Sequence, residues 1–224
     1  MSRHMYFHRE IDDLKKTILK LGTLVEDRLR RACAILETRN EAQAQALMAA
    51  DWEIDDMEIR VEEECLKILA LHQPVARDLR LIVMIIKINN ELERIADIAV
   101  NIAKRVVTIN KCGTPGSVFT FDYQPMAAKV LEMVKASLDA LVTEDAALAR
   151  QIFLLDDEVN RLRDAAYKTV IEEIGLHGDN AACLVNVYLI ARHLERIGDR
   201  AMNIAEEIIY LVEGEIVRSS EDPH

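Results

Sequence analysis

The chain contains one fourteen-residue pattern twice, and this repetition restricts the fold more than any other feature. The first copy spans residues 92–105 and the second spans residues 194–207, at an offset of 102 positions. The identical positions are Leu92/Leu194, Glu93/Glu195, Arg94/Arg196, Ile95/Ile197, Asp97/Asp199, Ala99/Ala201, Asn101/Asn203, Ile102/Ile204 and Ala103/Ala205. Packing alone would preserve only the apolar positions. The repeat therefore indicates a duplicated unit that shares chemistry at its Glu-x-x-x-Asp segment.

Apolar residues recur every three or four positions through most of the 224 residues, which is the spacing of one face of an α-helix. The seven glycines and four prolines are few, and most of them fall at breaks between the periodic segments. This pattern predicts an all-α protein. We expect six long helices in two matched sets of three, over about 8–37, 41–71, 75–109, 125–142, 146–174 and 180–212.

The repeat extends beyond the fourteen residues, because residues 51–55 align with 156–160 at an offset of 105. The difference between the two offsets falls in a hairpin turn, where changes in loop length cost little. We therefore expect two tandem, pseudo-symmetric three-helix bundles. The predicted order is a first bundle at 1–112, a linker at 113–117, a second bundle at 118–218 and a short acidic tail at 219–224.

The formal net charge of −11 argues against a nucleic-acid partner. The charge is uneven, with −1 on residues 1–112 and −10 on residues 113–224, so a cationic partner would meet mainly the second half. The longest unbroken apolar run, Leu81 to Ile86, is far shorter than the roughly 20 residues that cross a membrane. We expect no membrane insertion.

The four cysteines are scattered, without a Cys-x-x-Cys pair, which favours buried free thiols in a reducing compartment. The N-terminal residues also lack the apolar core of a signal peptide. We therefore expect a cytoplasmic protein, which can still contact a membrane protein from the inner face.

The acidic residues of the repeat form a stripe along one helix face. Residues four apart lie one turn apart on the same face of a helix, so Glu93, Asp97 and Asn101 form one line of oxygen atoms. The second copy forms the same line with Glu195, Asp199 and Asn203. Relative to the core positions of the helix, this stripe lies on the flank or the outer face.

The preceding helix brings further oxygen atoms to the same level. In a hairpin that turns at Pro74, Asp55 and Glu93 are each 19 residues from the turn, and helices rise about 1.5 Å per residue. The second hairpin repeats this relation about a turn near Gly178. The two predicted clusters are Asp51, Asp55, Glu93 and Asp97, and Asp156, Asn160, Glu195 and Asp199.

Clustered carboxylates raise one another's pKa values unless a cation joins them. Oxygen ligands suit hard cations such as Mg²⁺, Mn²⁺ or iron, and the scarcity of His and Cys argues against a structural zinc site. The alternative is that the carboxylates are solvated flanks of amphipathic helices, with Arg94 and Arg196 as partners on the same helix. The equal distance of these residues from the turn does not decide whether the acidic residues of the two helices face each other.

The sequence shows no phosphate-binding glycine loop, nucleophile elbow or Ser/His/Asp arrangement. Two metal-dependent alternatives remain open. A metal-dependent hydrolase would need an open metal position beside a substrate pocket. A ferritin-like protein would carry Glu-x-x-His pairs that point into the core, whereas neither Glu93 nor Glu195 has a histidine three residues later.

At these motifs the chain resembles the PhoU family, accessory and regulatory proteins of bacterial phosphate-specific transport. The resemblance covers about residues 8–218. It rests on Gln73-Pro-Val-Ala-Arg-Asp-Leu-Arg80, Leu92-Glu-Arg-Ile-Ala-Asp97, Ala191-Arg-His-Leu-Glu-Arg-Ile-Gly-Asp-Arg200 and Asn203-Ile-Ala-Glu206. The family fold that it implies is two similar three-helix bundles.

The resemblance also implies a function. It implies a non-enzymatic regulator that links the phosphate ABC transporter, through its ATPase, to a sensor histidine kinase and represses the phosphate-starvation response. It implies a homodimer, and metal ions at Glu93, Asp97, Glu195 and Asp199, in some members as multinuclear iron or zinc clusters. The chain departs from the family pattern at Ala96, where glycine is usual, and at Asn160, where an acid is usual. The second cluster therefore carries one negative charge fewer.

Overall fold

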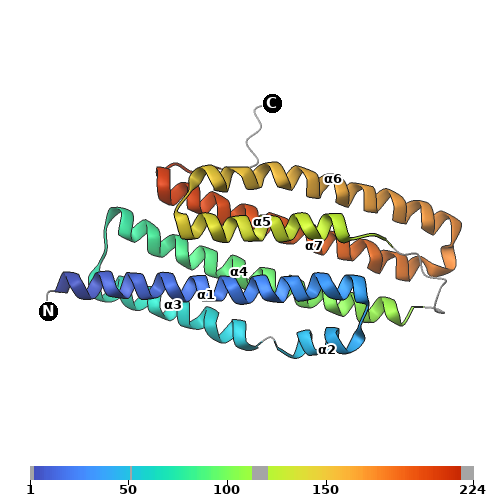
Figure 1. Cartoon of the computed structure of the whole chain (residues 1–224), viewed down its shortest axis with the longest axis horizontal. Coiled ribbons are helices and arrows are strands. Elements are labelled where there is room, and N and C mark those ends of the chain that lie inside the picture. The colour runs from blue at the N-terminus through green and yellow to red at the C-terminus, as the bar shows by residue number, and fades with distance from the viewer. Residues whose placement is uncertain (1–2, 51, 113–120, 218–224) are drawn as a thin grey trace.

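The computed structural model describes residues 3–50, 52–112 and 121–217, and all regular elements in these ranges are helical (Figure 1). This confirms the predicted all-α class. The elements are α1 (Arg3–Thr38), α2 (Glu41–Ala49), α3 (Trp52–His72), α4 (Ala76–Asn110), α5 (Gln124–Thr143), α6 (Ala146–Leu176), the short 3₁₀ helix η1 (Gly178–Asn180) and α7 (Ala181–Glu213). The predicted linker at 113–117, the tail at 219–224 and the candidate ligand Asp51 lie outside the described residues.

The helices pack in two sets that follow the sequence repeat (Figure 1). In the first set α1 to α3 pack on α4, and in the second set α5 and α6 pack on α7. The two sets meet where α4 packs along α7 and α1 packs against α5. Gly22 permits α1 to pack closely against α5, because a Cβ atom there would lie 2.5 Å from the side chain of Leu138. The exact domain boundary stays a prediction.

α4 and α7 are the most buried helices, because each is covered both by its own set and by the other. Their buried side chains therefore extend over more of the helix surface than the narrow stripe of an outer helix. Leu92 and Leu194, which are equivalent in the repeat, are both fully buried. The repeated motifs thus lie on the two central helices, with their acidic residues directed toward α3 and α6.

The turns lie where the sequence predicts them. Asn40 caps α2 by accepting a hydrogen bond from the backbone N–H of Gln43, and Asp145 caps α6 through the backbone N–H groups of Ala147 and Leu148. Gly214 ends α7 with a φ of 78°, in the left-handed region that glycine enters without strain. Pro74 lies in the turn between α3 and α4.

One predicted helix is interrupted. The helix expected over residues 41–71 is observed as α2 and α3, with α2 ending before Ala50. The buried side chain of Arg28 donates a hydrogen bond to the carbonyl oxygen of Ala50, which satisfies one of the carbonyls that the interruption frees. The repeat places Met133 at the position equivalent to Arg28, and α6 continues without interruption.

Candidate cation clusters and an acidic groove

The predicted cluster of the second half comes together between α6 and α7. The Asn160 side-chain amide donates to Asp156 Oδ2 at 2.8 Å. Burial raises the pKa of Asp156 to about 6, and the carboxylates of Asp199 and Glu195 contribute to the increase. The two acidic stripes therefore face each other in this half, which the sequence left undecided.

Glu195 is the most buried member of this cluster, with 6% of its surface exposed. Its Oε1 atom accepts hydrogen bonds from Arg163 at 2.7 Å and from Arg192 at 2.6 Å. Its Oε2 atom and Asp156 Oδ1 are both buried without a hydrogen-bond partner in the described chain. Buried carboxylate oxygens of this kind require an explanation, and a bound cation would provide one.

The first half gathers a more acidic cluster between α3 and α4. Burial raises the pKa of Glu93 to about 7, and the carboxylates of Asp97, Glu58 and Asp55 raise it further, opposed by Arg94. The pKa of Glu58 is also raised, by burial and then by its acidic neighbours on α3. Glu58 is thus a member of the cluster that the sequence analysis missed.

The two clusters differ at one equivalent position. Glu58 lies three residues after Asp55 and Arg163 lies three residues after Asn160, so the offset of 105 makes them counterparts. Glu93 consequently faces a carboxylate, whereas Glu195 faces a guanidinium group. Extending the alignment by three positions on the same helix face would have found both residues, because residues i and i+3 lie close together.

The two asparagines of the predicted stripe do not join the clusters. Asn101 Oδ1 accepts a hydrogen bond from Lys104 at 3.3 Å, and Asn203 lies on a neighbouring groove. Within the described ranges, no three His, Cys, Asp or Glu side chains have the arrangement of a metal site. The metal ligands therefore stay a prediction, and binding would require some carboxylates to rotate.

The donor sets of both clusters nevertheless suit a hard cation. The first offers the carboxylates of Asp55, Glu58, Glu93 and Asp97. The second offers the orphaned oxygens of Asp156 and Glu195, with Asp199 adjacent. All of these ligands are oxygen atoms, which fits Mg²⁺, Mn²⁺ or iron better than zinc.

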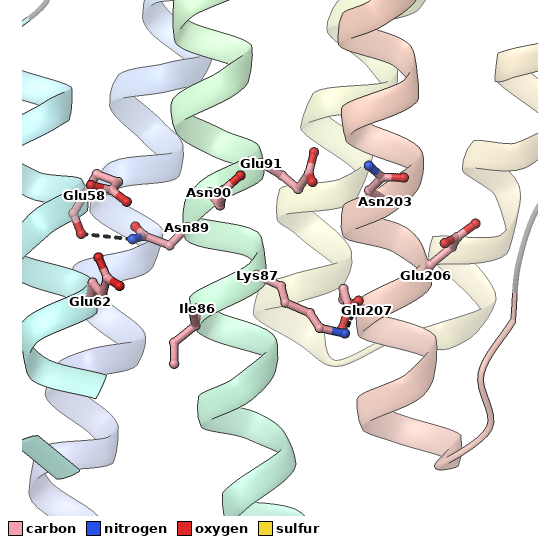
Figure 2. Close-up of a pocket in the computed structure, with 10 residues that line it drawn as sticks. All are labelled: Glu58, Glu62, Ile86, Lys87, Asn89, Asn90, Glu91, Asn203, Glu206 and Glu207. Atoms are coloured by element: carbon pink, nitrogen blue, oxygen red, sulfur yellow. Dashed lines mark hydrogen bonds and ion pairs between the residues drawn. The ribbon is translucent and has the colours of Figure 1, made fainter. Parts of the chain in front are cut away.

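An acidic groove of about 460 Å³ lies between α3, α4 and α7 (Figure 2). It is lined by Glu58, Glu62, Ile86, Lys87, Asn89, Asn90, Glu91, Asn203, Glu206 and Glu207. Lys87 pairs with Glu207 at 2.7 Å and Arg200 pairs with Glu91 at 3.2 Å, so the basic groups here join α4 to α7. The groove is continuous with the first cluster through Glu58.

Asn89 fixes one wall of this groove. Its side chain is 1% exposed and donates from Nδ2 to the carbonyl oxygen of Glu58 at 2.9 Å, as the dashed line in Figure 2 shows. This bond holds α3 against α4 at the level of the cluster. The second half has Ala191 at the equivalent position, which again makes the two halves chemically different.

His193 is buried beside the second motif, with both ring nitrogens lacking a hydrogen-bond partner in the described chain. Burial and the nearby Arg105 and Arg196 lower its pKa to about 4. The imidazole is therefore neutral near pH 7. Glu91 occupies the equivalent position in the first motif, so no shared histidine site exists in the repeat.

None of the helices in the described ranges is long and apolar enough to cross a membrane.

Comparison with known proteins gives a consistent result. The PhoU domain family matches residues 18–106 and 124–208. The chain is 35% identical to "Phosphate-specific transport system accessory protein PhoU homolog 1" of Thermotoga maritima, over 96% of this chain and 92% of that relative. It is 37% identical to the PhoU homolog of Pseudomonas aeruginosa, over 95% of this chain and 87% of that relative.

Two crystal structures of PhoU proteins have the same fold. The structure of PhoU from Pseudomonas aeruginosa superposes with a TM-score of 0.88 at 35% identity, over 93% of this chain and 100% of the other. The structure of the phosphate transport system regulatory protein PhoU from Streptococcus pneumoniae gives 0.84 at 28% identity, over 95% and 99%. The repeated motif, the helical fold and the full-length similarity together show that this chain belongs to the PhoU family.

Proposed function

We propose that this protein is a non-enzymatic regulator of phosphate uptake and signalling. The observation that supports this most strongly is similarity over nearly the full length to proteins named phosphate-specific transport system accessory proteins. In the described part of the chain, long helix faces are exposed, and we recognise no arrangement of side chains that is typical of a catalytic site. Such surfaces suit an adaptor that acts by binding other proteins.

The proposed partners are the ATPase of the phosphate ABC transporter and a sensor histidine kinase. In this proposal the protein contacts the transporter at the inner face of the membrane and, when phosphate is plentiful, keeps the kinase from activating the phosphate-starvation response. It would work in the cytoplasm as a homodimer. The family resemblance supports each of these steps.

We also propose that a hard divalent or trivalent cation binds at the acidic clusters. Asp55, Glu58, Glu93 and Asp97 would hold it in the first half, and Asp156, Glu195 and Asp199 in the second. A cation there would neutralise Glu93 and Asp156, whose pKa values are raised by burial and by neighbouring carboxylates, and would thereby tie α3 to α4 and α6 to α7. Metal binding would then stabilise the faces that the partners contact.

A deletion strain tests the regulatory function. Without this protein, alkaline phosphatase should be produced in high phosphate, and the intact gene should restore repression. Co-purification from the complemented strain should recover the transporter ATPase or the kinase. Normal repression in the deletion strain, with neither protein recovered, would rule the proposal out. Metal-dependent hydrolysis of phosphate esters by the purified protein would instead favour the hydrolase alternative.

A further inference from the structure

The outer face of α3 carries an apolar ridge that the fold leaves uncovered. Trp52, Ile59 and Leu66 are 70%, 54% and 54% exposed. They are seven residues apart, so they lie almost in line along the helix, about 10 Å from one to the next. α3 packs on α1 and α4 through its other face and lies along the edge of the molecule in Figure 1.

The duplicated half shows that the bundle does not need apolar side chains at two of the three ridge positions. At the offset of 105, the positions equivalent to Trp52 and Ile59 are Asp157 and Asp164, both exposed on α6. The same helix position therefore tolerates a carboxylate in one half and carries a large apolar side chain in the other. Apolar side chains arranged in line on an exposed face are typical of surfaces that bind another protein.

The charge around the ridge defines what can cover it. α3 contains seven acidic residues against two basic ones, Arg60 and Lys67. Arg60 is paired with Asp56 at 2.8 Å and Lys67 with Glu10 at 2.9 Å, so both bases are engaged within the chain. On α6 the same count is six acidic against four basic residues. α3, which carries the ridge, therefore has a larger excess of negative charge than its counterpart α6.

We propose that the α3 ridge docks an amphipathic helix of a partner protein, with apolar residues at heptad spacing and Lys or Arg residues on its flanks. Apolar side chains of the partner would pack against Trp52, Ile59 and Leu66, while its basic flanks would meet the acidic residues of α3. A second copy of this chain fits poorly, because two α3 helices would bring like charges together. This inference deepens the adaptor function proposed above and rests on it for the existence of a partner.

Trp52 makes the ridge directly observable, because it is the sole tryptophan of the chain. The probe is a synthetic helical peptide of three heptads with Leu at the core positions and Lys on the flanks, and its counterpart carries Glu on the flanks. The Lys peptide should shift the tryptophan emission of the full-length protein to shorter wavelength, saturably and less strongly at high salt. The Glu peptide should leave the emission unchanged.

Ile59→Asp separates apolar docking from simple charge attraction, since it copies the residue of the duplicated helix and adds a negative charge. This variant should weaken binding of the Lys peptide at least about tenfold, because the apolar side chain of Ile59 would no longer be there to be buried against the peptide. Leu66→Asp should do the same. Ile171→Asp, at the position equivalent to Leu66 on α6, is the matched control and should bind normally. Circular dichroism checks that each variant remains helical.

Three results would overturn the proposal. They are an unchanged emission with the Lys peptide, equal binding of both peptides, and undiminished binding to Ile59→Asp. A shift that depends on protein concentration without any peptide, together with dimer formation through α3, would also overturn it by assigning the ridge to a second copy. The peptide experiment does not involve phosphate regulation. Its failure would therefore not count against the adaptor function, and normal repression in a deletion strain would not count against helix docking at the α3 ridge.

Discussion

Glu195 accepts a hydrogen bond from Arg163 at 2.7 Å, whereas Glu93, its counterpart in the repeat, faces Glu58. The duplicated clusters have therefore diverged in charge while the motif itself is unchanged. In the second half, guanidinium groups neutralise part of the buried charge. In the first half, repulsion among carboxylates persists and favours protonation or a cation.

Arg163 should stabilise the fold more than an ordinary surface arginine. Arg163→Met removes one of the two arginine partners of the buried Glu195 carboxylate. We expect the free energy of unfolding to fall by about 2–3 kcal/mol, which is somewhat less than the cost of leaving a buried charge with no partner at all. Urea denaturation measures this. Arg161→Met is the matched control, since Arg161 is exposed on the same helix, and it should cost less than about 0.5 kcal/mol. Equal losses for the two variants would contradict a structural role for the Arg163–Glu195 pair.

The raised pKa of Glu93 should make the stability fall as pH rises. The folded protein holds a proton on Glu93 up to about pH 7, whereas the unfolded chain releases it near the ordinary glutamate value. The folded state therefore binds more protons between about pH 4.5 and 7, and the free energy of unfolding decreases across this window. Glu93→Gln should flatten this decrease in denaturation measured at several pH values. An unchanged slope would show that Glu93 is not protonated in the fold.

The sequence predicted the helical class, most helix ends and the pairing of the motifs, because these depend on local periodicity and on turn residues. It did not predict the interruption at Ala50. The residues around this position are compatible with a helix, and the side chain that bonds the Ala50 carbonyl oxygen, Arg28, lies on α1 and reaches Ala50 only in the folded protein. Long-range contacts of this kind leave no local pattern.

The candidate site was predicted in part. Counting residues from the hairpin turns identified Asp55, Asp156, Glu195 and Asp199 as cluster members, because the two helices of an antiparallel pair rise equally per residue. It missed Glu58 and Arg163, because each lies three residues beyond the end of its aligned segment, at Asp55 and Asn160. It included Asn101 and Asn203, which continue the stripe on one helix but lie beyond the facing helix's acidic residues. Whether a metal binds is not encoded in spacing.

Gly198→Ala should be tolerated and slightly stabilising. A Cβ atom at Gly198 would lie 3.4 Å from Asp156 Oδ1 and 3.5 Å from Met133, which are ordinary contact distances. The first half already carries Ala96 at this position. We expect a gain of about 0.5–1 kcal/mol from helix propensity, measured by thermal denaturation. Ala96→Gly should lose a similar amount, and a loss for Gly198→Ala would indicate that α7 needs the extra space beside Asp156.

His193 should oppose the effect of Glu93 in acid. Its folded pKa of about 4 lies below the ordinary value of about 6.5, so the unfolded chain binds more protons between these values. The contribution to stability is complete above about pH 6.5 and is lost as pH falls toward 4. His193→Leu should abolish this loss of stability at low pH, and it also removes two buried ring nitrogens that lack hydrogen-bond partners. Its melting temperature should therefore exceed that of the wild type by more at pH 5 than at pH 7.5, and equal differences would contradict the neutral, buried state.

Titration with Mn²⁺ or Mg²⁺ should reveal binding at both clusters, since each offers carboxylates that repel one another without a cation. Glu93→Ala combined with Asp97→Ala should remove about half of the bound metal, and Asp156→Asn combined with Asp199→Asn the remainder. Glu63→Ala combined with Glu64→Ala removes the same charge from the exposed face of α3 and should leave uptake unchanged. Uptake should also weaken below about pH 6, where protons compete for the ligands. If the wild type binds no metal and the first double variant titrates like it, the carboxylates do not form a cation site, and the raised pKa values of Glu93 and Asp156 reflect burial and the neighbouring carboxylates alone.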